Sequence, residues 1–262
     1  RLSSVNPNLQ NIPIRTESGK EIRKAFIPRN KDFFLMAADY SQIELRVIAA
    51  LSKEDNMIRS FEKNEDIHLS TAATVFNIPL EKVTKQQRSH AKIVNFGIIY
   101  GVSAFGLSNQ TDLNIKESKN LIDTYYEKYP KLKQFIEKQI SFARDKGYVE
   151  TILGRRRVLR DINSSNSIIK SAAERNAVNA PIQGSAADII KMSMINIQKA
   201  FISKKIKSKM LLQIHDELVF DVFKPELNQV MEIVRYQMEN VFKLDVPLSV
   251  DINYGVNWLE AH

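Results

Sequence analysis

The stretch KMLLQIHDELVFDV, residues 209–222, decides the fold, because it places a charged triplet between two apolar segments. Each apolar segment has the length and composition of a short strand bound for a hydrophobic core. The triplet of His215, Asp216 and Glu217 is either a turn that returns the chain to water or part of a site that needs carboxylates. Aspartate is common at hairpin tips because its side chain bonds nearby backbone groups. A second carboxylate placed to act with Asp216 would distinguish the two interpretations.

A candidate for that second carboxylate is Asp39, near the end of the apolar segment DFFLMAADY at residues 32–40. The segment is too short and too evenly apolar for an amphipathic helix, so we predict a buried strand. A helical pattern follows, and Ser41 with Glu44 three residues later matches a capping box. Asp39 is therefore either a turn residue or one of two carboxylates on neighbouring strands. Such a pair suits two Mg²⁺ ions about 4 Å apart.

The first half of the chain changes from irregular to helical. Residues 1–30 are rich in Asn, Pro and Gly, which predicts irregular structure. Residues 53–150 have a mostly helical pattern with polar breaks at Asn77–Pro79, Asn114 and Tyr129–Pro130. We therefore predict several helices in the middle of the chain.

The second half alternates strand and helix patterns. A short strand pair is predicted around Gly154, and a helical pattern over 171–203 is expected to break at Pro181 and Gly184. After the hairpin we predict a helix over 225–243 and a strand over 246–255. Together the patterns predict an α+β fold, with strands from both ends of the chain flanking a helical middle.

The composition favours an anionic partner and excludes some kinds of site. The net charge is +8, which suits nucleic acid or anionic lipid. The chain has no cysteine and four histidines, so disulfides and thiolate zinc sites are excluded and a structural zinc site is disfavoured. We expect neither a membrane span nor a signal peptide, because the sequence shows no apolar run of about 18 residues and no charged-then-apolar leader. An intracellular protein is expected.

The middle of the chain contains a stripe of charged and aromatic residues in RSHAKIVNFGIIYG, residues 88–101. Arg88, Lys92, Phe96 and Tyr100 recur every four residues, so on a helix they share one face that drifts by about 40° per step. Two cations followed by two aromatics suit a nucleotide, whose phosphates and base they would contact. The alternative is an amphipathic helix with buried aromatics and cations that extend into solvent.

Three stretches taken together resemble the polymerase motifs of family A DNA polymerases, the bacterial DNA polymerase I type. They are DYSQIELR at 39–46, RSHAKIVNFGIIYG at 88–101 and IHDELV at 214–219, in the family's order. The resemblance extends to RLSSVNPNLQNIPIR at 1–15, AAERNAVNAPIQGSAADIIK at 172–191 and GVNWLEAH at 255–262. It therefore covers essentially the whole chain.

The resemblance implies a right-hand polymerase architecture, with an antiparallel palm sheet and a large helical fingers subdomain. It assigns residues 1–52 and 172–262 to the palm and residues 53–171 to the fingers. The family's thumb and exonuclease domains precede the position of Arg1, so we expect the thumb to be absent from this chain. We also expect the chain to be a C-terminal piece that ends naturally at His262.

The resemblance also implies a reaction, in which a primer 3′-hydroxyl attacks the α-phosphate of a deoxynucleoside triphosphate and pyrophosphate leaves. Two Mg²⁺ ions would be held by Asp39, Asp216 and the backbone carbonyl of Tyr40, with Glu217 as a supporting carboxylate. Lys92 would protonate the pyrophosphate. The other nucleotide contacts that it implies are Arg88, Phe96, Tyr100, Glu44, Gln42 and His68. The DNA contacts that it implies are Arg1, Asn8, Gln10, Arg175, Asn179, Gln183 and His215.

Several of these residues have a second interpretation. Glu44 either closes the capping box or lies beneath the incoming sugar, where its bulk would exclude a 2′-hydroxyl. His68 and His215 are alternatively ordinary structural histidines. The run Arg155–Arg157 is interpreted as a backbone-phosphate or loop charge cluster without a catalytic part.

Primer-template DNA and deoxynucleoside triphosphates are the implied partners, with no membrane and a monomeric state. The expected location is the cytoplasm, in association with the nucleoid, or an organelle. Two other functions remain open at this point. One is a two-metal nuclease, and the other is a catalytically weak nucleic-acid-binding fragment of a polymerase.

Overall fold

The computed structural model describes residues 5–6, 8–12 and 16–262 and divides the chain into two compact units. The sheet unit comprises Arg1–Ile43, Ala186–Lys243 and Leu248–His262, and the helical unit comprises Glu44–Ser185 and Leu244–Pro247. No helix within the described part of the chain is long and apolar enough to span a membrane.

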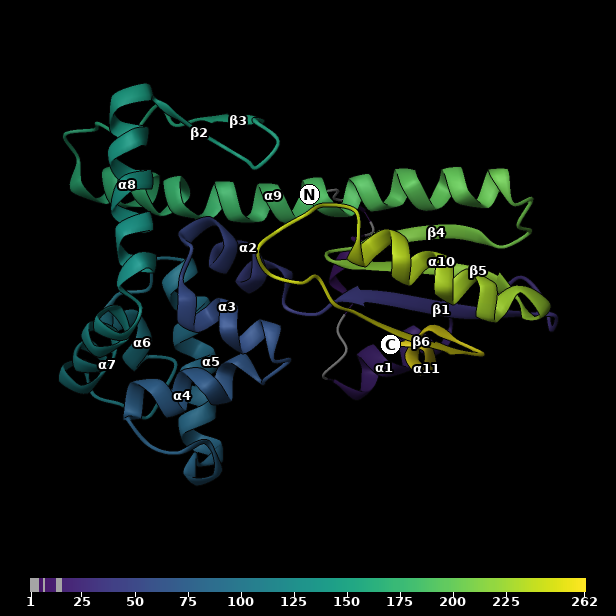
Figure 1. Cartoon of the computed structure of the whole chain (residues 1–262), viewed down its shortest axis with the longest axis horizontal. Coiled ribbons are helices and arrows are strands. Elements are labelled where there is room, and N and C mark those ends of the chain that lie inside the picture. The colour runs from purple at the N-terminus through teal and green to yellow at the C-terminus, as the bar shows by residue number, and fades with distance from the viewer. Residues whose placement is uncertain (1–4, 7, 13–15) are drawn as a thin grey trace. The chain divides into compact units, whose positions relative to one another are not determined.

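The sheet unit is built on a four-stranded antiparallel sheet in the order β4-β5-β1-β6 (Figure 1). Its strands are β1 Phe33–Tyr40, β4 Lys209–Ile214, β5 Glu217–Phe223 and β6 Val250–Gly255. The predicted hairpin is present, and the strands come from both ends of the chain as predicted. His215 and Asp216 connect β4 to β5, with His215 at a φ of 55°, in the left-handed region that tight hairpin turns require.

Helices cover both faces of this sheet. On one face the ring of Phe220 lies 6.1 Å from that of Phe201 on α9, and α10 packs beside it. On the other face Leu35 and Val219 form a core cluster with Trp258 of α11. The remaining elements of the sheet unit are η1 Leu9–Asn11, α1 Glu17–Lys24, η3 Lys224–Glu226, α10 Leu227–Glu239 and α11 Trp258–Ala261.

Helix α1 occupies part of the N-terminal segment, so the prediction of irregular structure throughout residues 1–30 is wrong. The Thr16 hydroxyl caps the helix by accepting a hydrogen bond from the Gly19 N–H at 3.2 Å. Two Lys–Glu ion pairs at i,i+3 spacing support it from the surface. Its last turn places the Arg23 guanidinium 4.1 Å from the centre of the Trp258 ring. Capping and this tertiary contact outweigh the local composition.

The helical unit confirms the predicted run of helices and its breaks. Asn77 ends α4 in the left-handed conformation, Asn114 caps α7, and Pro130 begins α8. The predicted strand pair around Gly154 is also present, with Gly154 at a φ of 75°. The elements are α2 Ile43–Ser52, α3 Asp55–Glu62, α4 Ile67–Phe76, η2 Leu80–Lys82, α5 Lys85–Ile99, α6 Ala104–Ser108, α7 Ile115–Lys128, α8 Pro130–Lys146, β2 Tyr148–Glu150 and β3 Arg156–Val158.

Helix α9, Ser167–Ser203, contributes residues to both units and corrects the prediction of a break at Pro181 and Gly184. Gly184 is a packing position, because a Cβ there would lie 2.5 Å from Thr151 Cγ2. The Ser185 hydroxyl donates to the Pro181 carbonyl at 2.5 Å, which adds a hydrogen bond next to the proline. The proline removes one backbone donor, but a long apolar side of the helix is buried and sustains it.

Candidate active site

Asp39 lies near the end of β1, next to the β4–β5 turn. In the strand registers Asp39 pairs with Glu217 on β5 and with Asp251 on β6. The Tyr40 N–H donates to the Asp216 carbonyl at 3.3 Å. The two predicted carboxylates, Asp39 and Asp216, therefore stand at the same end of two neighbouring strands, and the charged triplet serves as both a turn and part of an acidic cluster.

The Asp39 carboxyl group lies in surroundings that disfavour its negative charge. Burial, and then the charges of Asp216 and Glu217, raise the pKa of Asp39 to about 7, and His262 opposes the shift. Its Oδ1 atom is buried and has no hydrogen-bond partner. Because buried carboxylates are normally hydrogen-bonded or paired, this orphaned oxygen fits a site that a cation completes.

A cation site here would rest on few protein ligands. Among residues 5–6, 8–12 and 16–262, no group of three or more His, Cys, Asp or Glu side chains is arranged to hold a metal ion. Asp39 and Asp216 supply carboxylate oxygens, and the backbone carbonyl of Tyr40 is adjacent in the chain. Carboxylate and carbonyl oxygens suit Mg²⁺, which usually keeps several ligands from water and substrate phosphates. The donor set therefore fits Mg²⁺ bound together with a substrate.

The Tyr40 side chain anchors the end of β1. Its hydroxyl donates to the Met238 carbonyl at 2.7 Å and lies 2.7 Å from the Ser193 hydroxyl. Burial raises the pKa of the Tyr40 phenol. Because successive side chains of a strand point to opposite faces, these bonds hold the backbone while Asp39 faces the other side.

Both oxygens of Glu217 are engaged by α11 and the residue that follows it. The Trp258 indole N–H donates to Oε1 at 2.7 Å, and His262 Nδ1 lies 2.5 Å from Oε2. This contact with Glu217 raises the pKa of His262, and Arg23 lies close enough for Glu217 to act on its charge. Glu217 thus ties α11 to the sheet beside Asp39. Sequence reasoning missed this arrangement because nothing in the pattern indicates a carboxylate partner for Trp258.

Trp258→Phe is expected to lower the free energy of unfolding by about 1–3 kcal/mol, because the buried Glu217 carboxylate loses a donor. Thermal unfolding followed by circular dichroism measures the loss. Tyr236→Phe, at a side chain that is 63% exposed, is the matched control and should have little effect. Equal stability of the Trp258→Phe variant and the unchanged protein would mean that other groups hold Glu217.

The predicted stripe on α5 faces outward. Lys92 and Tyr100 are exposed and Arg88 and Phe96 are half-buried, whereas Asn95 at the edge of the stripe and the apolar residues on the opposite side of the helix are buried. The alternative of an amphipathic helix with its aromatics inside is therefore wrong for Tyr100. An accessible stripe of two cations and two aromatics is available to a ligand.

Two contacts order the N-terminal part of this stripe. The Arg88 guanidinium forms an ion pair with Asp66 at 2.6 Å, and Asp66 in turn caps α4. The ring of His68, on α4, lies 5.7 Å from the ring of Phe96. Helix α4 therefore places His68 beside the stripe, together with Arg88 and Lys92, whose charges act on it.

Glu44 is bonded to the other end of the stripe. Its Oε2 accepts a hydrogen bond from the Tyr100 hydroxyl at 2.7 Å, and the Ser41 N–H donates to the Ser249 carbonyl at 2.9 Å. These two bonds engage the groups that a capping box would join. Gln42 has a φ of 54°, so the helix starts one residue later than the capping box requires. The predicted capping box is therefore wrong, and Glu44 is a partner of Tyr100.

The predicted DNA contacts in the sheet unit lie around β4. Gln10 Nε2 donates to the Gln213 carbonyl at 3.3 Å, and Asn8 caps the short helix that contains Gln10. His215 is exposed in the β4–β5 turn. Arg1 lies outside the described residues. The short helix Leu9–Asn11 thus lies beside the strand that leads to Asp216.

The predicted DNA contacts in the helical unit form a row on α9. Arg175, Asn179 and Gln183 are four residues apart and share one face. Asn179 Oδ1 is buried without a hydrogen-bond partner. The Arg175 side chain packs on Gly101, where a Cβ would lie 2.6 Å from Arg175 Cγ. The row is spatially continuous with the C-terminal end of the α5 stripe through this packing.

The three consecutive arginines bond to other parts of the helical unit. Arg155 donates to the Gly184 carbonyl at 3.0 Å, Arg156 to Glu150 at 2.8 Å, and Arg157 to Asn176 at 3.3 Å. These bonds fix the β2–β3 hairpin, which agrees with a loop charge cluster.

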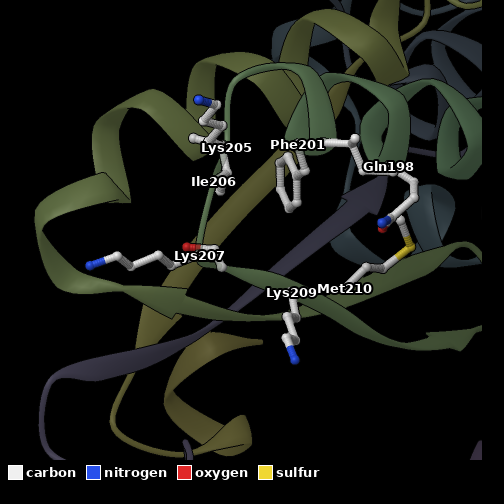
Figure 2. Close-up of a pocket in the computed structure, with 9 residues that line it drawn as sticks. Gln198, Phe201, Lys205, Ile206, Lys207, Lys209 and Met210 are labelled. Atoms are coloured by element: carbon white, nitrogen blue, oxygen red, sulfur yellow. The ribbon is translucent and has the colours of Figure 1, made fainter.

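A cavity of about 360 Å³ lies elsewhere in the sheet unit, between the end of α9 and the start of β4 (Figure 2). Its lining includes the apolar residues Phe201, Ile206 and Met210. The ammonium groups of Lys205, Lys207 and Lys209 point away from one another in Figure 2, so they do not converge on one anion. The cavity contains none of the predicted site residues.

Comparison with known proteins identifies the family of the chain. The family model "DNA polymerase family A" matches residues 1–260. The chain is 52% identical to DNA polymerase I of Streptococcus pneumoniae and 48% identical to that of Borreliella burgdorferi, over all of this chain and 30% and 29% of those proteins. The polymerase domain of the M. smegmatis enzyme, solved in complex with DNA primer-template and dNTP, is 45% identical, with a TM-score of 0.95 over 100% of this chain and 46% of that one.

The chain thus spans about a third of the length of the curated relatives that it matches. The match to the family model nevertheless runs through the acidic cluster at the end of β1, the α5 stripe and the β4–β5 turn. The chain belongs to DNA polymerase family A.

Proposed function

We propose that this chain carries out template-directed nucleotidyl transfer from a deoxynucleoside triphosphate to a primer 3′-hydroxyl. The observation that carries the proposal is the carboxyl group of Asp39, whose surroundings disfavour its negative charge, next to Asp216 and within a matched family A sequence. The M. smegmatis neighbour, solved with primer-template and dNTP, supports the same substrates.

We assign the sheet unit to the palm and the helical unit to the fingers. This moves the proposed boundaries from residues 52 and 172 to residues 43 and 186, where the two units divide. We further propose that the protein acts as a monomer on DNA, in the cytoplasm with the nucleoid or in an organelle. The net charge of +8 supports a polyanionic partner.

In the palm, Asp39, Asp216 and the Tyr40 carbonyl would hold two Mg²⁺ ions. When bound, these ions would lower the pKa of the primer hydroxyl and offset the charge on the triphosphate. Strands on both sides pair with the end of β1, and the Tyr40 anchor holds its backbone. Glu217 supports Asp39 from the next strand, where Trp258 and the residue after α11 hold it.

In the fingers, the α5 stripe would bind the incoming nucleotide. Arg88, held by Asp66, and Lys92 would contact phosphate oxygens, and Lys92 would donate a proton to the leaving pyrophosphate. Phe96 and Tyr100 would frame the sugar and base. Gln42 would contribute a polar contact. The residues proposed to contact primer or template are Arg1, Asn8, Gln10, Arg175, Asn179, Gln183 and His215, through the backbone or minor groove.

Extension of a labelled primer in the presence of Mg²⁺ tests the proposed function. A polymerase lengthens the primer according to the template, whereas a two-metal nuclease shortens it. A silent binding fragment retards the DNA on a gel and leaves its length unchanged. The last two outcomes would each overturn the proposal.

Glu44→Ala is expected to raise the use of ribonucleotides relative to deoxyribonucleotides by at least about tenfold, because the side chain would no longer exclude the 2′-hydroxyl. Glu44→Gln should change the ratio far less, since it keeps the length and an acceptor for the Tyr100 hydroxyl. Single-nucleotide incorporation with matched ribo and deoxy substrates measures the ratio.

The control for this prediction is Glu62→Ala, the same change at an exposed position on α3. It should leave sugar preference unaltered. If Glu44→Ala loses stability yet keeps the full preference for deoxy sugars, Glu44 serves only to hold Tyr100.

A further inference from the structure

Asn95 lies at the centre of a buried polar network that joins three helices of the helical unit. It is 1% exposed and lies seven residues after Arg88 on α5, at the buried edge of the nucleotide stripe. Its Nδ2 donates to His68 Nδ1 at 3.1 Å and to the Thr71 hydroxyl at 3.1 Å. Its Oδ1 accepts from the Tyr125 hydroxyl at 2.9 Å, and the Tyr129 hydroxyl donates to Thr71 at 3.3 Å.

The Tyr125 hydroxyl determines which of two orientations the Asn95 side-chain amide adopts. Tyr125 is 1% exposed, and Asn95 Oδ1 is the acceptor that its hydroxyl proton reaches. Turning the amide over would leave that buried proton without an acceptor, at a cost of about 1–3 kcal/mol. Nδ2 therefore faces His68.

This orientation determines where the proton of His68 is. An amide nitrogen only donates, so His68 Nδ1 must accept and carries no proton. The imidazole stays neutral because burial, and then Arg88 and Lys92, lower its pKa to about 4, against the opposite effect of Asp66. A neutral ring whose Nδ1 accepts carries its proton on Nε2.

We propose that Asn95 is a positioning residue that fixes His68 as the Nε2–H tautomer, so that His68 donates an uncharged hydrogen bond to an oxygen of the triphosphate. This rests on the proposed function. Arg88 and Lys92 already act on the same ring, and a third full charge would be repelled by them. A neutral donor adds a directed bond there without adding charge.

Asn95→Asp tests the proposal because it is nearly isosteric and reverses the direction of one hydrogen bond. The carboxylate still accepts from Tyr125, and the Thr71 hydroxyl can turn to donate to it. Toward His68, however, it can only accept, so the imidazole must place a proton on Nδ1. The variant therefore moves the proton while keeping the packing.

The direct readout is the two-bond ¹H–¹⁵N spectrum of the protein with ¹⁵N-labelled histidine at pH 7, free of substrate. The chain has four histidines, and His68→Gln identifies the signal of His68. We expect a protonated Nε2 and an unprotonated Nδ1 in the unchanged protein, and a protonated Nδ1 with an unprotonated Nε2 in Asn95→Asp. A protonated Nδ1 in the unchanged protein would overturn the proposal.

The kinetic readout is KM for the nucleotide in single-nucleotide extension. Asn95→Asp and His68→Leu, which has no donor, should each raise this KM about tenfold or more, the usual loss for a hydrogen bond to a charged group. Asn120→Asp, the same change at an exposed position on α7, should not. If the His68 proton moves from Nε2 to Nδ1 in Asn95→Asp and the KM for the nucleotide does not change, His68 is not the proposed donor.

Thr71→Val separates positioning from packing. It removes a hydroxyl of the network but leaves the bond from Asn95 to His68, so it should lower the melting temperature without moving the proton. A displaced proton in this variant would contradict the assignment to Asn95. Absence of extension in the unchanged protein would overturn the proposed function, while the spectrum would still decide the tautomer.

Discussion

Asp39→Asn is expected to lower the rate of primer extension by about a thousandfold while raising the thermal stability of the metal-free protein. The rate falls because the substitution removes one of the two proposed carboxylate ligands of the metal ions, a loss of several kcal/mol of transition-state stabilisation. Stability rises because the buried charge of Asp39, next to Asp216 and Glu217, disappears while the side-chain shape is kept. Single-turnover extension and thermal unfolding in a chelator measure the two effects.

The gain in stability should depend on pH. The pKa of Asp39 is about 7 in the folded protein against an ordinary value of 3.8, so the folded state binds the extra proton between these values. The contribution of Asp39 to the free energy of unfolding is therefore fully present below about pH 4 and is lost as pH rises through 7. The Asp39→Asn variant does not lose stability in this way as pH rises. Its free energy of unfolding should exceed that of the unchanged protein by the largest amount above pH 7, and the difference should vanish near pH 4.

Asp251→Asn is the matched control for this prediction. Asp251 pairs with Asp39 in the register of β6, but it is exposed and contributes little to the pKa of Asp39. The primer-extension rate and the thermal stability should change far less in Asp251→Asn than in Asp39→Asn. An Asp39→Asn variant that extends primers normally would remove Asp39 from the reaction.

Lys92→Ala is expected to lower the single-turnover rate by about a hundredfold or more, the usual contribution of a positioned proton donor. Binding of primer-template should stay nearly unchanged, because Lys92 is proposed to contact the triphosphate. Rapid-quench extension and a DNA titration, both at one salt concentration, separate the two effects. Lys119→Ala removes a comparable exposed charge from α7 and should alter neither. If DNA affinity falls and the rate does not, Lys92 is only a backbone contact.

Much of the fold could be predicted because local patterns and tertiary packing agree in it. The even apolar run at residues 32–40, the charged turn at Asp216 and the polar break at Asn114 each became the expected element boundary. The spacing from Arg88 to Tyr100 also placed the stripe on one accessible face of α5. These features depend on residues close in sequence.

The predictions that proved wrong concern features that are determined by contacts between residues far apart in the sequence. Pro181 stands inside α9 because burial sustains the helix, and α1 forms where Arg23 packs on Trp258. Asn95 gave no signal in the sequence, since a buried asparagine inside a helical pattern has no periodic signature. Its partners come from α4 and α7. Contacts between residues on different helices can be identified only from the folded structure.

The most direct test of the central claim is single-nucleotide extension of a labelled primer-template, with each of the four deoxynucleotides offered separately in Mg²⁺. The account predicts that the primer gains one nucleotide only with the deoxynucleotide complementary to the template. It also predicts that a chelator or Asp216→Asn prevents the gain. A primer that becomes shorter, gains nucleotides regardless of the template, or is extended equally well by Asp216→Asn would contradict it.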